Sequence, residues 1–188
     1  MRKIFVISAP TNGGKTTLMA RLMSMRELEL HRVVTTNSRP PRPGEIDGVD
    51  YHFVTREKFE GKVAAGEFVE WAHVHNDLKG VERRALEGAC PDGGRILMQL
   101  DIQGYHTFKR ILSPDEYKVI GIFLEAPSLE VLLERWRKRA DYIDPVDLAK
   151  RTESYYKEMA ARFDFEYCVM NDDFEKCVRE VVQIIKAN

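Results

Sequence analysis

The chain has 188 residues, and its 29 lysines and arginines nearly balance its 30 aspartates and glutamates, which leaves a formal net charge of −1 at pH 7. This length fits one compact domain, and the balanced charge gives no support to a nucleic acid or a membrane surface as a partner, so we expect neither. No apolar run approaches the roughly 20 residues that span a bilayer, and Cys90, Cys168 and Cys177 have neither metal-binding nor disulfide spacing, so we expect a reduced, cytoplasmic protein.

The first predicted element is a strand at residues 4–8. Residues 1–7 begin like a signal peptide, but their apolar stretch is too short, and it leads straight into a loop that contains glycine and lysine. A helix through Leu18 and Leu22 follows, and later an apolar run at 96–100 precedes another helix. This alternation predicts an α/β fold with a parallel sheet and helical crossovers.

The second half of the chain continues the same pattern. Strands are predicted at residues 119–124 and 167–170. Apolar residues three and four positions apart predict helices at 129–136 and 174–185. Because these spacings place one apolar face of each helix on the sheet, we assign them a role in the core only.

The segment between residues 31 and 86 interrupts this pattern. It contains a proline-rich loop, predicted strands near 51–54 and 68–74, and a predicted helix at about 57–65. We interpret it as an inserted subdomain. A second irregular segment, at 137–147, carries Arg, Lys and Asp with one Pro between two helices, and we interpret it as a mobile, charged flap.

A phosphate-binding loop is predicted directly after the first strand, where it opens the first helix. It consists of Ala9, Pro10, Thr11, Asn12, Gly13, Gly14, Lys15, Thr16 and Thr17. Backbone N–H groups of such a loop converge on phosphate oxygens. We expect Lys15 to reach the β- and γ-phosphates of ATP, and the Thr16 hydroxyl to help hold Mg²⁺. The usual pattern begins with Gly, but Ala9 costs little unless it needs a positive φ, and Asn12 is compatible with a left-handed backbone.

An acidic residue is expected beside this loop. Residues 95–101 place Asp101 at the C-terminal end of a strand that should lie near the first. Asp101 is therefore the candidate for the Walker B acid, and its alternative roles are a strand-end acid or a cap of the following helix. An ordinary glycine-rich turn does not account for the strand, the helix, Lys15 and Thr16 together. These features predict an ATP-dependent phosphotransferase with a P-loop-type parallel sheet flanked by helices.

Two arginines in the proline-rich loop form a candidate anion site. In a polyproline II segment, positions three apart share a face, so Arg39 and Arg42 can point at one anion. Two guanidinium groups suit a phosphate. A solvated basic loop and a ligand for a proline-binding domain remain alternatives.

A predicted strand carries a carboxylate among apolar residues. Strand alternation places Glu70 on the same face as Phe68 and Ala72. A carboxylate there is costly to bury unless it has hydrogen-bond donors, so Glu70 can bind a ring that bears adjacent N–H groups. Trp71 is expected in the core.

Taken together, these residues resemble the guanylate kinase family along nearly the whole chain. The matching segments are APTNGGKTT at Ala9, SRPPRPGE at Ser38, GVDYHF at Gly48, GEFVEWA at Gly66, LDIQG at Leu100, the arginine-bearing segment 135–151 and VMNDD at Val169. The resemblance implies a core at 1–34, 83–134 and 152–188, a nucleotide-monophosphate-binding insert at 35–82, and a lid at 135–151. It also implies ATP as the phosphoryl donor, with Mg²⁺.

The resemblance implies roles for individual residues. On the acceptor side, Arg39, Arg42 and Tyr51 would hold the phosphate, Thr35 and Glu70 would face the guanine, and Asp101 would lie beside the acceptor and the metal. On the donor side, Arg135, Arg139 and Arg151 would close over the transferring phosphate, and Asn171 would lie near the adenine. The predicted catalytic set is therefore Lys15, Arg39, Asp101, Arg135, Arg139 and Arg151.

Two acceptor-site positions depart from the family pattern. Where the family has Tyr-Gly followed by Ser or Thr, this chain has Lys79-Gly80-Val81. Lys79 can replace the tyrosine as a point charge, but Val81 lacks the hydroxyl that meets a 6-oxo group, which should weaken selectivity for a 6-oxo purine by roughly 1 kcal/mol or more. We expect phosphoryl transfer from ATP to a nucleoside monophosphate, with GMP or dGMP as the acceptor. The alternatives are a different or modified monophosphate, and a non-catalytic module that binds phosphopeptides.

Overall fold

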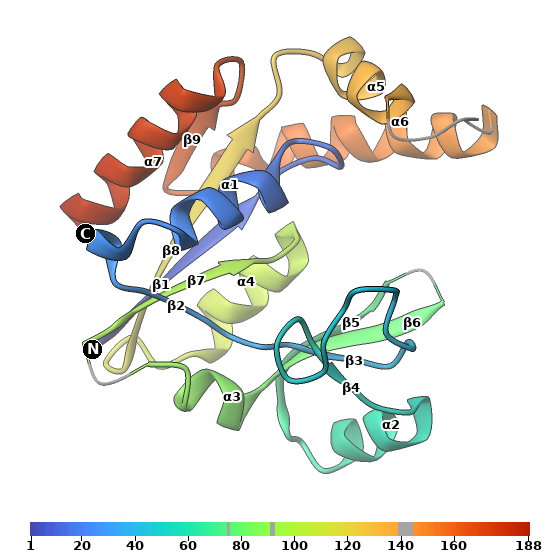
Figure 1. Cartoon of the computed structure of the whole chain (residues 1–188), viewed down its shortest axis with the longest axis vertical. Coiled ribbons are helices and arrows are strands. Elements are labelled where there is room, and N and C mark those ends of the chain that lie inside the picture. The colour runs from blue at the N-terminus through green and yellow to red at the C-terminus, as the bar shows by residue number, and fades with distance from the viewer. Residues whose placement is uncertain (75, 91–92, 139–144) are drawn as a thin grey trace.

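The structure is a computed structural model that describes residues 1–74, 76–90, 93–138 and 145–188. These residues form a five-stranded and a four-stranded sheet with helices around them (Figure 1). Within the described ranges, no helix combines the length and the apolar character that crossing a membrane requires.

The larger sheet consists of five parallel strands in the order β2-β7-β1-β8-β9. They are β1 (Arg2–Ser8), β2 (Leu30–Arg32), β7 (Arg95–Gln99), β8 (Tyr117–Glu125) and β9 (Tyr167–Met170). β1 lies in the centre, and its residues 4–7 are fully buried. A parallel sheet is covered on both faces, which explains why this strand is apolar throughout rather than alternating.

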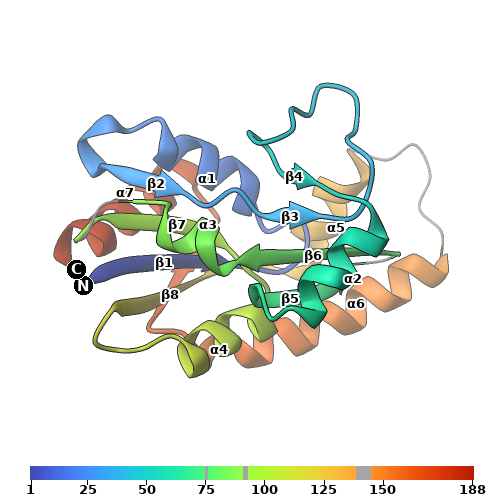
Figure 2. The ribbon, with the colours of Figure 1, turned by 90° about the horizontal axis from the view of Figure 1, so that it is seen from below.

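Helices cover both faces of the larger sheet (Figure 2). One face packs against α1 (Lys15–Met23), the short η1 (Arg26–Leu28) and α7 (Phe174–Ala187). On the other face lie α3 (Arg83–Glu87), α4 (Ile102–Ile111), α6 (Pro145–Ala160) and η2 (Ala161–Asp164), and α5 (Leu129–Arg137) extends from the end of β8. The carboxyl ends of β1 and β7 lead into α1 and α4, which brings the phosphate loop and Asp101 to the same edge of the sheet.

The smaller sheet has the strand order β4-β3-β6-β5 and lies within residues 36–82. Its strands are β3 (Thr36–Asn37), β4 (His52–Phe53), β5 (Phe68–Val74) and β6 (Asp77–Glu82), and α2 (Arg56–Ala64) covers one face. Phe59 of α2 stacks on Phe68 with ring centroids 4.4 Å apart. This separate apolar cluster joins α2 to one face of the smaller sheet, whereas Val69 and Val81 of the same sheet pack in the main core.

A β-bulge in β5 overturns the prediction that Phe68 and Glu70 share a face. Phe68 pairs with Glu82 and Glu70 pairs with Val81, so two steps along β5 match one step along β6. The extra residue reverses the alternation. Phe68 therefore packs toward Phe59, whereas Glu70 lines a cleft on the opposite face.

The predicted fold class is confirmed, and most long elements lie where the pattern placed them. The short elements β2, β3, β6 and α3 were not predicted, because few residues leave little periodicity to detect. The predicted flap overlaps the start of α6, which has Pro145 at its first position, where a missing N–H costs nothing. Trp71 was wrongly expected in the core: it is 42% exposed, with its ring edge-on to His73.

Gly121 should tolerate no side chain, because β8 passes directly beneath the stacked rings of Tyr105 and Phe165. A Cβ added at Gly121 would lie 2.6 Å from Tyr105 Cε2 and 2.7 Å from Phe165 Cδ1. Gly121→Ala should therefore destabilise the fold by about 1–3 kcal/mol, which lowers the melting temperature by roughly 3–10 °C in a chain of this size. Gly61→Ala, in an exposed turn of α2 with no atom within 4 Å of the added Cβ, is the matched control and should melt no lower than the parent. Equal melting temperatures for the parent and Gly121→Ala would contradict this packing.

Candidate active site

The loop between β1 and α1 turns so tightly that two of its positions exclude a side chain. Gly14 has φ +96°, and a Cβ added at Gly13 would lie 2.8 Å from both Ala9 Cβ and Pro10 O. Asn12 has the left-handed backbone that its residue type tolerates, with φ 64°. Ala9 is not among the positive-φ residues, which explains why the chain can carry alanine there.

Lys15 begins α1 and folds its side chain back across the loop. Its Nζ donates to the carbonyl oxygens of Ala9 and Pro10, the latter at 3.3 Å. Burial lowers the pKa of Lys15, and the nearby carboxylates of Glu158 and Asp101 oppose this shift. The ammonium group therefore lies close to the N-terminus of α1, where free N–H groups also favour an anion.

Asn171, at the end of β9, joins the loop to two other elements. Its side-chain Nδ2 donates to Gly13 O at 2.8 Å, and its backbone N–H donates to Glu125 O at 2.9 Å. Its carbonyl oxygen accepts a bond of 3.1 Å from the Arg135 guanidinium of α5. Asn171 is only 4% exposed, so its amide supports the loop from beneath, a role that sequence reasoning missed.

A cleft between the two sheets brings together many of the predicted site residues. Its walls come from the phosphate loop, the smaller sheet, the end of β7 with the start of α4, and α6. The predicted residues that line it are Ala9, Thr11, Lys15, Thr35, Glu70, Lys79, Val81 and Asp101. Val81 pairs with Glu70 across the two strands and is 1% exposed, so the side chain beside the Glu70 carboxylate is apolar and almost fully buried.

Glu70 has an unusual environment for a carboxylate. Burial raises its pKa to about 7, the neighbouring Asp101 charge contributes to the increase, and Lys79 opposes it. Near neutral pH the group therefore exchanges between a carboxylate, which only accepts hydrogen bonds, and a carboxylic acid, which also donates one.

Asp101 caps a helix, which was one of the alternatives considered from the sequence, and it also faces the cleft. Its Oδ1 accepts the Gly104 N–H at 2.7 Å, which caps the N-terminus of α4. The same residue lines the cleft and influences the pKa values of Lys15 and Glu70. The cap fixes the position of a carboxylate that faces the site.

The two arginines of the proline-rich loop meet a carboxylate of the chain itself. The Arg39 guanidinium binds Glu45 through two bonds of 2.6 Å, and the Arg42 backbone N–H donates to the same carboxylate at 2.7 Å. Arg39 Cζ lies 5.3 Å from the Tyr51 ring centroid, and Lys79 Nζ lies 5.0 Å from it. The side chain of Arg42 is exposed, and it is the Arg42 backbone that contacts the Glu45 carboxylate.

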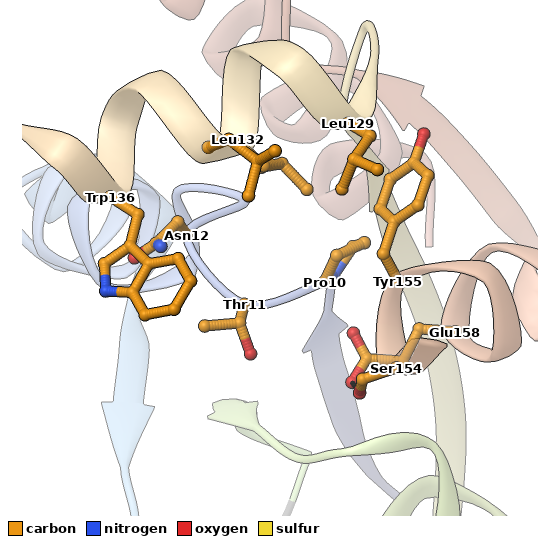
Figure 3. Close-up of a pocket in the computed structure, with 10 residues that line it drawn as sticks. Pro10, Thr11, Asn12, Leu129, Leu132, Trp136, Ser154, Tyr155 and Glu158 are labelled. Carbon is orange, nitrogen blue, oxygen red and sulfur yellow. Dashed lines mark hydrogen bonds between the residues drawn. The ribbon is translucent and has the colours of Figure 1, made fainter. Parts of the chain in front are cut away.

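A smaller pocket separates the phosphate loop from α5 and α6, and Figure 3 shows its mixed apolar and polar walls. The lining residues are Pro10, Thr11, Asn12, Leu129, Leu132, Leu133, Trp136, Ser154, Tyr155 and Glu158. Glu158 lines both this pocket and the cleft, and its Oε1 accepts the Ser154 hydroxyl at 2.9 Å. Burial raises the Glu158 pKa. Sequence reasoning missed Glu158, because a single acid on a helix has no spacing that singles it out.

Two predicted catalytic arginines cannot be placed. Arg139 lies outside the described residues, and so does the side chain of Arg151. Across the ranges that the structure describes, no three His, Cys, Asp or Glu side chains gather closely enough to hold a metal ion. The oxygen donors near the loop, the Thr16 hydroxyl and the Asp101 carboxylate, are of the type that Mg²⁺ prefers when phosphates and waters complete its shell.

The Glu70 carboxyl group should titrate near pH 7 rather than near its ordinary 4.5. Asp101→Asn removes a neighbouring negative charge and should lower the Glu70 pKa, whereas Lys79→Met removes a positive charge and should raise it. Carbon-13 NMR of labelled glutamate across pH 4–9 measures these values, with Glu70→Gln to assign the signal. A Glu70 signal that titrates near 4.5 and ignores both neighbours would contradict the buried cleft.

Comparisons with known proteins agree with one another. Residues 1–188 match the family model described as Guanylate kinase. A guanylate kinase of Idiomarina loihiensis is 35% identical over 185 residues, covering 98% of this chain and 86% of the relative, and one of Wolbachia pipientis is 37% identical over 183 residues, covering 97% and 88%. The crystal structure of guanylate kinase from Anaplasma phagocytophilum superposes with a TM-score of 0.75 at 28% identity, covering 98% of this chain and 84% of that one.

Proposed function

Because the chain belongs to the guanylate kinase family, we propose that it transfers the γ-phosphoryl group of ATP to the phosphate of GMP, which yields ADP and GDP. The observation that carries this proposal is the cleft whose walls include Lys15, Glu70 and Asp101. A phosphate-binding lysine and a carboxylate that can bind a base, on the walls of one cleft, are what a kinase with a nucleotide acceptor requires.

On the acceptor side, Glu70 binds the guanine base. The ionised carboxylate accepts hydrogen bonds from the N1–H and 2-amino groups of guanine, which adenine cannot match with the same edge. Since only the ionised form accepts both, guanine binding strengthens as the pH rises through about 7, the pKa of Glu70. Thr35 lies on the same wall, and Arg39, Arg42, Tyr51 and Lys79 bind the acceptor phosphate.

On the donor side, the loop from Ala9 to Thr17 binds the ATP phosphates. Backbone N–H groups at the start of α1 donate to phosphate oxygens, and Lys15 swings from the loop carbonyls to the β- and γ-phosphates. Thr16 and Asp101 are suited to orient Mg²⁺, which when bound neutralises charge on the phosphates. Asn171 keeps the loop in shape beneath the nucleotide.

Catalysis consists mainly of alignment and charge neutralisation. The acceptor phosphate is already an anion with a free oxygen, so it attacks the γ-phosphorus in line without a general base. Lys15, the loop backbone and the arginines Arg135, Arg139 and Arg151 take up the charge that spreads over the transferring group. Closure of the insert and the lid excludes water and so prevents hydrolysis of ATP.

The same proposal covers the organisation of the chain and its setting. The core at 1–34, 83–134 and 152–188 carries the donor site, the insert at 35–82 the acceptor site, and 135–151 the lid. Three free thiols, one of them exposed, suit a reducing cytoplasm. The named relatives are all guanylate kinases, and none of them points to another acceptor or to a non-catalytic phosphopeptide-binding module.

An acceptor panel tests the proposed function. With ATP and Mg²⁺, GMP and dGMP should be phosphorylated with a kcat/KM at least roughly tenfold above that for AMP, because adenine leaves the Glu70 carboxylate unpaired. A coupled assay for ADP, repeated with IMP and other nucleoside monophosphates, gives the ranking. No turnover with any acceptor, or a clear preference for a base without adjacent N–H groups, would overturn the assignment. A small advantage of GMP over 6-substituted analogues would reflect the apolar Val81.

Lys15→Met should lower kcat by about 10²- to 10³-fold, because the variant keeps the length of the side chain but loses the charge that stabilises the transferring phosphoryl group. Circular dichroism should report an intact fold, since the first turn of α1 does not depend on the ammonium group. Steady-state kinetics with saturating GMP and ATP measures the loss. A variant that retains more than about a third of the parental kcat would show that Lys15 does not bear on the transition state.

A further inference from the structure

Arg39, Arg42, Tyr51 and Lys79, which are proposed to bind the acceptor phosphate, are here called the acceptor clamp. Glu45 contacts two of them, Arg39 and Arg42, although neither the sequence pattern nor the proposed mechanism gives it a role. Its Oε2 accepts from Arg39 NH1 and its Oε1 from Arg39 NH2, both at 2.6 Å. Oε2 also accepts the Arg42 backbone N–H at 2.7 Å. The side chains of Arg39 and Glu45 are 13% and 20% exposed, so this pair is shielded more than an ordinary surface ion pair.

The way in which Glu45 binds Arg39 leaves one edge of the guanidinium available. A guanidinium group has two forks, one formed by its two terminal nitrogens and one formed by Nε with a terminal nitrogen. Glu45 occupies the first fork, and Pro40 O takes a further NH1 proton at 2.9 Å. Among the described residues no hydrogen bond engages Arg39 Nε, so the second fork can still bind an anion.

Aromatic rings hold the same guanidinium from its sides. Arg39 Cζ lies 5.3 Å from the Tyr51 ring centroid and 5.5 Å from that of Phe53, and the two rings meet edge to face. Such contacts favour a cation and restrict its rotation. With one fork on Glu45 and two rings beside it, Arg39 has little freedom left, and Lys79 supplies a second cation, whose Nζ lies 5.0 Å from the Tyr51 ring centroid.

The Glu45 carboxyl group has an unusually low pKa. The Arg39 guanidinium, and then the Arg42 N–H, lower the Glu45 pKa to about 2. The carboxylate is therefore ionised at neutral and mildly acidic pH, and the arrangement of Arg39 does not change with pH in this range.

We propose that Glu45 is a positioning residue for the acceptor: it holds one fork of Arg39 so that the other fork binds the phosphate of the nucleoside monophosphate. This inference rests on the proposed function, because it requires Arg39 to bind that phosphate. Pre-orienting a long, flexible side chain reduces the entropy that is lost on binding. The opposite idea is that Glu45 occupies the place of the phosphate and must be displaced. The two differ in sign, since removal of the Glu45 charge weakens acceptor binding in the first case and strengthens it in the second.

Glu45→Gln keeps the size of the side chain and removes its charge. We expect KM for GMP to rise roughly tenfold, the size of one charge-assisted hydrogen bond, while kcat and KM for ATP change by less than about twofold. Calorimetric titration with GMP alone should give the same rise in Kd. The loss should be equal at pH 6.5 and 8, which separates it from any effect that acts through Glu70.

Glu60→Gln is the matched control. Glu60 pairs with Arg56 Nε at 2.9 Å in the same insert, but on exposed turns of α2 away from the clamp. This variant should leave all kinetic constants at the parental values. Glu45→Asp, which retains the charge on a shorter stem, should fall between the parent and Glu45→Gln. Thermal unfolding of each variant shows whether a change in KM arises from loss of folded protein.

The Arg39→Ala background separates the inference from the proposed function. If Glu45 acts through Arg39, Glu45→Gln should have no further effect on the Kd for GMP once Arg39 is removed. Unchanged GMP binding in Arg39→Ala alone would overturn the acceptor clamp itself. Weak binding in Arg39→Ala with parental binding in Glu45→Gln would overturn only the role of Glu45. Tighter GMP binding in Glu45→Gln would show that Glu45 competes with the phosphate.

Discussion

The site depends above all on one buried hydrogen bond, from the Asn171 amide to the carbonyl oxygen of Gly13. The phosphate loop needs the backbone conformations of Asn12 and Gly14, which are costly unless the surrounding structure holds them. Asn171 provides that support from a neighbouring part of the sheet, and its carbonyl oxygen at the same time anchors Arg135 of α5. A Cβ at Gly14 would lie 2.5 Å from the Asn171 amide nitrogen, so the glycine and the asparagine are matched to each other. Asn171 therefore connects the loop before α1, the end of β9 and α5.

The electrostatics of the cleft follow from this arrangement. Its lining contains three carboxylates, Glu70, Asp101 and Glu158, and two ammonium groups, Lys15 and Lys79. A site that binds two phosphorylated nucleotides is thus not simply a basic pocket. The free N–H groups at the start of α1 favour an anion, whereas Asp101 caps a helix and burial raises the pKa values of Glu70 and Glu158.

The sequence predicted those parts of the molecule that depend on local chemistry. Gly13, Gly14 and Lys15 between an apolar strand and an amphipathic helix indicated the donor loop, and the apolar runs indicated the larger sheet. What could not be predicted depends on contacts between distant residues. The role of Asn171 beneath the loop and the approach of Glu158 from α6 require the folded chain, since their partners lie far away in sequence. The reversal at Phe68 follows from a single bulge, which leaves no mark in an alternating pattern.

That bulge also limits how the smaller sheet can evolve. In many parts of a sheet, gain or loss of one residue only shifts a loop. In β5, the same change would reverse which side chains face the cleft, because successive residues of a strand point to opposite faces. Deletion of a single residue beside Val69 would turn Glu70 and Ala72 toward the cluster around Phe59 and turn apolar side chains toward the cleft. Point substitutions such as those at positions 79 and 81 can therefore change the cleft gradually. A single-residue insertion or deletion in β5 would disrupt the cleft unless a second one restores the register.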